Sequence, residues 1–167
     1  MTERRLERRL VWVTGAFIVV AGTLLHFCYD WSGRNRLVGL LAPVSESVWE
    51  HTKLLVVPVL VAGLAEAFLL PSRRLVAWAT LAECVAGALA IPAIFYAYTG
   101  ALGTGPVLWV DIGTFVAVVA AGQWLHLRVL TGAVAPPAAV SVLGIVLLVG
   151  IYVAWTLAPP GLPLFQA

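Results

Sequence analysis

The stretch PVSESVWEHTKLL, residues 43 to 55, gathers two glutamates, a histidine and a lysine in a chain that is otherwise strongly apolar. Carboxylates and imidazoles that lie at one level can bind a divalent metal ion or perform acid–base chemistry. Two residues elsewhere in the chain, His26 and Asp111, are expected at the same level as this stretch. The candidate catalytic or ligand-binding residues are therefore His26, Glu46, Glu50, His51 and Asp111. A divalent metal is a possible cofactor, with candidate ligands His26, Glu50, His51 and Asp111.

Further polar and aromatic residues should surround this group. Those expected at its rim are Tyr29, Asp30, Lys53, Tyr96 and Tyr98. A plainer interpretation is open for the aromatic ones, because tyrosine and tryptophan, including Trp31, Trp49 and Trp109, are enriched where a membrane meets water.

The charges of the 43–55 stretch also have an alternative explanation as a helix start. Ser47 and Glu50 fit the S-x-x-E capping box, in which both side chains bond to free amides. Glu46 would favour the positive end of the helix dipole whether or not a site exists. If the helix already begins at Ser45, Glu46, Glu50 and Lys53 form one polar stripe.

The amino-acid composition indicates which kind of fold must position these residues. Of the 167 residues, 62% are hydrophobic and 11% charged, far from the composition of soluble proteins, and the mean hydropathy is +1.00. A bilayer core needs about 20 apolar residues per helix. We predict one all-α membrane domain over residues 1–167 with five spans, at residues 10–28, 52–70, 75–96, 107–127 and 138–157.

The orientation of the bundle follows from its basic residues. With the N-terminus inside, the cytoplasmic side holds seven of them, Arg4, Arg5, Arg8, Arg9, Arg73, Arg74 and Arg128, against three outside, Arg34, Arg36 and Lys53. Cytoplasmic loops carry the excess of positive charge. We therefore expect the N-terminus in the cytoplasm, the C-terminus outside, and the 43–55 stretch at the outer face of the plasma (inner) membrane.

Small residues and prolines indicate how the helices pack. Gly15, Gly22 and His26 share one face of the first span, where glycines let helices approach closely. Glycines Gly87, Gly113 and Gly122 are expected to do the same in later spans. Pro58 and Pro92 should free backbone carbonyls that need partners within the bundle. Cys28 and Cys84 lie at different depths, so no disulfide is expected.

A second polar group is expected inside the membrane. Glu66, Glu83 and Gln123 lie at similar depth near the cytoplasmic side and form a possible proton or ion site, because acids within membranes are costly and commonly functional. His126 is interpreted as a headgroup contact. On a straight helix Glu66 points away from Glu50, which favours two separate sites.

Five motifs resemble a family of small multi-pass prokaryotic membrane proteins, a domain of unknown function with an APVxESVWEH motif. They are HFCYDWSG at 26–33, APVSESVWEHTKLL at 42–55, YAYTGALG at 96–103, VDIGTF at 110–115 and PPGLPLF at 159–165. The family pattern commonly has asparagine at Ser45 and histidine at Gly161. Asparagine and serine are both good N-caps, so the exchange favours a helix start at Ser45. The resemblance implies no activity.

Three functions remain open, and the sequence does not decide whether the protein is an enzyme. The first is an outer pocket that binds a metal or a small-molecule ligand, or that acts on a lipid-linked substrate. The second is a small ion- or proton-coupled carrier that uses the intramembrane glutamates. The third is a non-catalytic subunit of a membrane complex. The expected partners are the lipid bilayer and a second copy of the chain, with no nucleic acid.

Overall fold

The computed structural model describes residues 3–132 and 134–166, and for Glu3 and Arg4 the backbone alone. Its elements are six α-helices and a short 3₁₀ helix: α1 (Glu3–Trp31), α2 (Arg36–Gly39), α3 (Val48–Leu69), α4 (Arg73–Leu102), α5 (Leu108–Gly132), α6 (Ala138–Leu157) and η1 (Pro163–Phe165). The described residues contain no β-strand. The prediction of an all-α protein is confirmed.

Five of the helices are long and apolar enough to cross a membrane. The segments that could cross are 27, 22, 30, 25 and 20 residues long, the first being Arg5–Trp31 within α1, and each contains one of the predicted spans or most of it. The predicted bounds were too short at several ends. α1 begins before residue 10. α4, which contains the third predicted span, continues to Leu102 instead of ending at Tyr96. Helices extend beyond the apolar core, so hydropathy marks the middle of a helix better than its ends.

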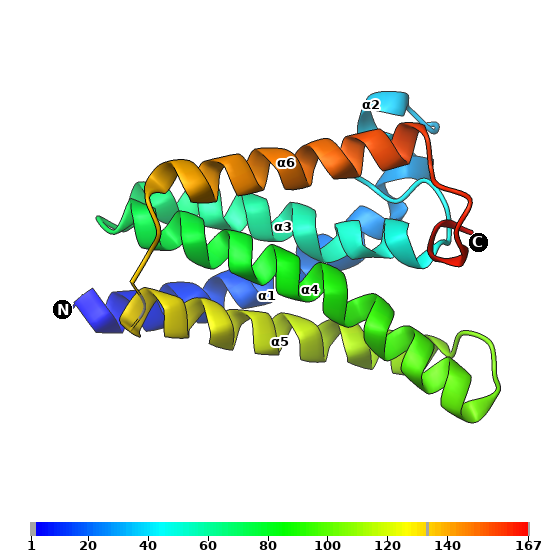
Figure 1. Ribbon diagram of the computed structural model, residues 1–167. Coiled ribbons are helices and arrows are strands. Elements are labelled where there is room, and N and C mark those ends of the chain that lie inside the picture. Colours follow the sequence, from blue (N-terminus) through cyan, green and yellow to red (C-terminus); the bar gives the residue numbers. More distant parts are fainter. Residues whose placement is uncertain (1–2, 133, 167) are drawn as a thin grey trace.

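Four helices form the body of the bundle. α3 packs against α1 and α4, and α5 packs against α1 and α4, while α6 lies along α4 (Figure 1). The two ends of the chain lie at opposite ends of the bundle, as an odd number of spans requires. α2 and the C-terminal segment lie at the same end, which we call the loop end (Figure 1).

A glycine of α1 and a proline of α3 together allow these two helices to approach closely. Pro58 has no N–H, so the carbonyl of Leu54 loses its usual partner within α3. A Cβ atom on Gly22 would lie 2.3 Å from that carbonyl oxygen. The freed carbonyl therefore faces the bare backbone of α1 at Gly22, on the face that was expected to meet another helix. The expectation that Gly113 also lets two helices approach closely was wrong, because a Cβ atom at Gly113 would have no neighbour within 4 Å.

The core consists of two apolar clusters with a polar layer between them. The cluster toward the loop end contains Ile18, Leu55, Val59, Cys84 and Val118, among others. The cluster toward the N-terminal end contains Val11, Leu70, Val76, Val129 and Leu130, among others. In α3, α4 and α5, buried polar side chains fall between residues of the two clusters, and in α1 the partly buried Thr14 does so. Both cysteines are free.

The start of α3 corrects the prediction of a helix from Ser45. Ser47 is the N-cap, and its hydroxyl accepts a hydrogen bond from the backbone N–H of Glu50. Glu46 precedes the helix and is not on its polar stripe. The capping box is half formed, because the Ser47 N–H bonds to the Ser45 hydroxyl at 3.4 Å and the Glu50 carboxylate points elsewhere.

Candidate functional site

The connection between α1 and α3 carries Glu46 and joins the two helix ends that carry His26 and His51. It leaves α1 through Gly33 and Arg34, which both have positive φ angles of 67° and 60°. Asn35 then caps the single turn of α2 by accepting from the Leu37 N–H at 2.9 Å. Gly39 in α2 packs against Tyr29 of α1, where a Cβ would lie 3.0 Å from the ring. The loop is therefore folded back onto the end of α1.

A buried ion pair ties this loop to α3. The Lys53 ammonium donates to the Glu50 carboxylate at 2.7 Å and to the carbonyl of Gly39 at 3.0 Å. The same Glu50 oxygen accepts from the Val44 N–H at 2.8 Å. Both side chains are at least 95% buried. Burying two charges is tolerated here because each has several hydrogen-bond partners, and these partners are the backbone of the loop.

The loop also rests on an aromatic cluster around Trp49, a residue that the sequence had assigned to the membrane surface. Trp49 is 7% exposed and stacks on Tyr152 of α6 with ring centroids 4.6 Å apart. Trp155 and Phe165 contact the same indole. By contrast, Trp31 and Trp109 are well exposed, as residues at a membrane surface would be. Glu50 and Trp49 therefore hold α3, α6 and the C-terminal segment together.

His26, Glu46 and His51 come together at the loop end. Each offers one ligand atom, and these atoms lie within 4.8 Å of one another. His51 Nε2 is 3.4 Å from a Glu46 oxygen, and the rings of His26 and His51 are 5.3 Å apart. Three separate segments supply them: α1, the loop and the first turn of α3. The Glu46 side chain is 75% exposed, so the group is open to the surroundings.

The two histidine rings have different surroundings. His51 Nδ1 lies 2.9 Å from the Ser47 carbonyl oxygen, so this nitrogen carries the proton. In the neutral ring, Nε2 then presents a lone pair toward the Glu46 carboxylate. Nδ1 of His26 is buried without a hydrogen-bond partner among the described residues. If His51 is neutral, its Nε2 and the Glu46 carboxylate are both acceptors, and a cation between them would satisfy both.

The other residues of the predicted site are placed elsewhere. Asp111 accepts a hydrogen bond from the Tyr98 hydroxyl at 2.7 Å, and that hydroxyl also accepts from the Val107 N–H. This pair pins the turn between α4 and α5, which lies apart from α2 and its loop in Figure 1. Asp30 forms an exposed ion pair with Arg34. Tyr96 is 42% exposed and packs edge-on against its neighbour Phe95.

The predicted intramembrane residues form a buried network with two members that the sequence analysis missed. His126 lies between the two acids, with Nε2 2.8 Å from Glu66 and Nδ1 2.8 Å from Glu83. Gln123 donates to Glu83 at 2.6 Å, and the Thr14 hydroxyl contacts Glu66. Because its side chain is 3% exposed, His126 is not a headgroup contact.

Helical spacing could have revealed the placement of His126. It follows Gln123 by three residues, so both fall on one helix face, and Gln123 was already assigned to the polar group. Its nearness to Arg128 in the sequence favoured the surface instead. Thr14 carried no comparable signal, because a lone threonine in an apolar helix commonly bonds only to its own backbone.

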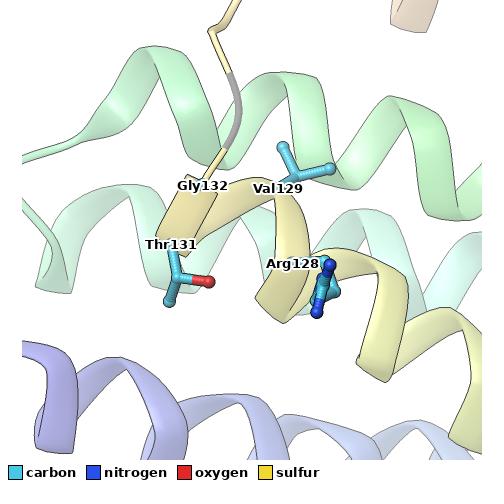
Figure 2. A pocket seen from close by; sticks show the side chains of 4 residues that line it. All are labelled: Arg128, Val129, Thr131 and Gly132. Carbon is cyan, nitrogen blue, oxygen red and sulfur yellow. The ribbon is translucent and has the colours of Figure 1, made fainter.

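A hollow of about 460 Å³ opens beside the last turn of α5 (Figure 2). It is lined by Arg128, Val129, Thr131 and Gly132, all from that one turn. The Arg128 guanidinium lies 5.5 Å from the Trp124 ring centroid, on its own helix. The hollow contains none of the predicted site residues, and its walls offer a single charged group.

Comparison with known proteins assigns the chain to a family but gives it no function. Neither a curated protein nor a solved structure matches it. A protein-family match extends over residues 1–167, which is the whole chain. The protein belongs to the family of unknown function DUF6512.

Proposed function

We propose that this membrane protein binds one divalent transition-metal ion at the loop end, through His26, Glu46 and His51. The observation that carries the proposal is the convergence of one ligand atom from each residue within 4.8 Å. Two imidazoles and a carboxylate are a ligand set that suits zinc and other first-row metals better than magnesium or calcium.

Binding requires only a small closure of the three side chains. Zinc–ligand distances of about 2.0–2.1 Å put neighbouring ligands of a tetrahedral ion about 3.3 Å apart. The Glu46 oxygen and His51 Nε2 are already 3.4 Å apart. The hydrogen bond from His51 Nδ1 to the Ser47 carbonyl orients the ring and makes Nε2 more basic.

Three protein ligands leave one coordination position for water or for a ligand. In sites of this kind the metal can lower the pKa of its bound water or polarise a substrate oxygen. Together with the predicted outer orientation, the open position would face lipid headgroups and solvent. A headgroup or a small anion is the class of ligand that such a position would accept.

Elemental analysis of the protein purified in detergent tests the proposal. We expect about one equivalent of metal per chain after zinc loading and desalting, and its loss in His26→Ala, Glu46→Gln and His51→Ala. Removing one of three ligands should weaken binding by at least the 10–100-fold that loss of an outer partner costs. Helicity and monodispersity should stay unchanged, since Glu46 and His51 are partly exposed.

Two matched controls make the result specific. Asp30→Asn removes an exposed carboxylate at the same end, and Asp111→Asn removes the acid that bonds to Tyr98. Both variants should keep the metal. Equal metal content in all five variants, or loss in Asp111→Asn alone, would overturn the assignment and leave Glu46 and His51 as an ion pair.

A further inference from the structure

The buried polar layer is short of hydrogen-bond donors. Its ionisable members are Glu66 from α3, Glu83 from α4 and His126 from α5, and α1 and α5 add the neutral Thr14 and Gln123. Glu66, Glu83, Gln123 and His126 are 1–3% exposed. Apolar clusters lie on both sides of the layer along the bundle.

Glu83 has all the donors that an ionised carboxylate needs. One oxygen accepts from Gln123 Nε2 at 2.6 Å, and the other faces His126 Nδ1 at 2.8 Å. A carboxylate with a donor on each oxygen is stable in its charged form even when buried. The bond also fixes the orientation of the Gln123 amide, so that its oxygen points toward α1.

Glu66 has fewer hydrogen-bond donors around its carboxylate than Glu83. Its Oε2 lies 2.8 Å from His126 Nε2 as an ion pair without hydrogen-bond geometry, while its Oε1 has the Thr14 hydroxyl, at 3.0 Å, as its contact. That hydroxyl carries one hydrogen and lies within 3.1 Å of four oxygens, from Leu10, Val11, Glu66 and Gln123. The two backbone oxygens belong to α1 and accept within the helix. The two side-chain oxygens still need two hydrogens, and Thr14 supplies one.

Counting protons among the three ionisable groups resolves the deficit. With two protons, both on His126, the layer has a net charge of −1, and either Glu66 Oε1 or Gln123 Oε1 has no donor. A third proton on Glu66 Oε1 makes the layer neutral. It donates to the Thr14 oxygen, and the Thr14 hydroxyl is then free to donate to Gln123. Because an uncompensated buried charge is expensive, the neutral arrangement is favoured.

We propose that the layer is a proton-binding site, in which Glu66 holds one proton against Thr14 and Gln123 inside the membrane-spanning bundle. The site is independent of the metal group at the loop end. Since both apolar clusters cover it, the proton can leave only when the helices separate locally. If the bundle opens first at one end and then at the other, the site exchanges its proton with each side of the membrane in turn.

Infrared difference spectroscopy of the full chain in detergent at neutral pH tests this proposal. The wild type should show the C=O stretch of one protonated carboxylic acid per chain, which shifts in D₂O. Glu66→Gln should abolish this band. Glu46→Gln, which changes an exposed carboxyl at the other end of the bundle, should keep it.

A second variant covers the case in which Glu66→Gln does not fold. Thr14→Val is nearly isosteric and removes the hydroxyl that accepts the proton, so the acid band should persist at a shifted frequency. An unshifted band in Thr14→Val, or a band that survives in Glu66→Gln, contradicts the proposal. A wild type without the band whose thermal stability rises with sodium would show that the oxygens hold a metal cation instead.

Discussion

At the scale of single residues, Lys53 shows how a charge can be buried for structural reasons. Its ammonium joins Glu50 to the carbonyls of Gly39 and Ala42, at 3.0 and 3.5 Å for the latter two. The lysine therefore replaces the water that the loop backbone would otherwise need. The sequence placed Lys53 at the rim of a pocket, whereas the structure places it beneath the loop that carries Glu46.

Removing the Lys53 charge should both destabilise the protein and weaken metal binding. Lys53→Met leaves Glu50 buried without its cation, and breaking such a pair costs about 3–5 kcal/mol. Denaturant unfolding in detergent would measure the loss, and elemental analysis would measure the metal. Arg34→Met breaks an exposed ion pair in the same connection and should change neither quantity much. Equal effects of the two substitutions would contradict this role.

At the scale of elements, the contact between α1 and α3 depends on what two residues lack. Gly22 has no side chain and Pro58 has no N–H, so a free carbonyl meets a bare stretch of helix. Between α3 and α4, Cys84 makes a separate weak contact, with its sulfur 3.9 Å from the Val56 carbonyl oxygen. Such close packing stabilises helices in lipid, where the hydrophobic effect between helices is absent.

Alanine substitutions at two glycines should separate packing from helix propensity. Gly22→Ala puts a methyl group against the Leu54 carbonyl and should destabilise the bundle by about 1–3 kcal/mol. Gly113→Ala meets open space on α5 and should be neutral or gain up to about 1 kcal/mol, because alanine favours the helix. Thermal unfolding in detergent would show the difference. A Gly22→Ala variant as stable as Gly113→Ala would disprove the close contact.

At the scale of the whole molecule, the two polar groups occupy different levels of one bundle. The group of His26, Glu46 and His51 lies at the loop end, where the connection between α1 and α3 folds back (Figure 1). The layer around His126 lies between two apolar clusters, nearer the N-terminal end. This separation agrees with the expectation from helix geometry that Glu50 and Glu66 do not line one channel.

The orientation of the bundle can be tested with its two natural cysteines. Cys28 is partly exposed near the loop end of α1, and Cys84 is buried. If the N-terminus is cytoplasmic, an impermeant thiol reagent added to intact cells should label Cys28 and leave Cys84 unlabelled until the protein unfolds. The Cys28→Ser variant should lose the label. Labelling of Cys28 only from the cytoplasmic side would reverse the orientation and place the metal group inside.

The sequence by itself determined the fold class and the approximate spans, because about 20 apolar residues per helix is a requirement of the bilayer and can be counted. It also identified Glu66, Glu83 and Gln123 as a group, since their depth follows from position within a span. Depth along a helix is a local property, which a single sequence contains.

Tertiary structure decided which of the residues at one depth meet. Glu46, Glu50 and His51 are close neighbours in the sequence, yet Glu50 turns inward to Lys53 while Glu46 faces His51. His126 lies between two acids from different helices, and Asp111 pairs with Tyr98 instead of the histidines. These contacts depend on the rotation of each helix and on how one loop folds back. Both are set by packing across the bundle, which the spacing along one chain does not specify.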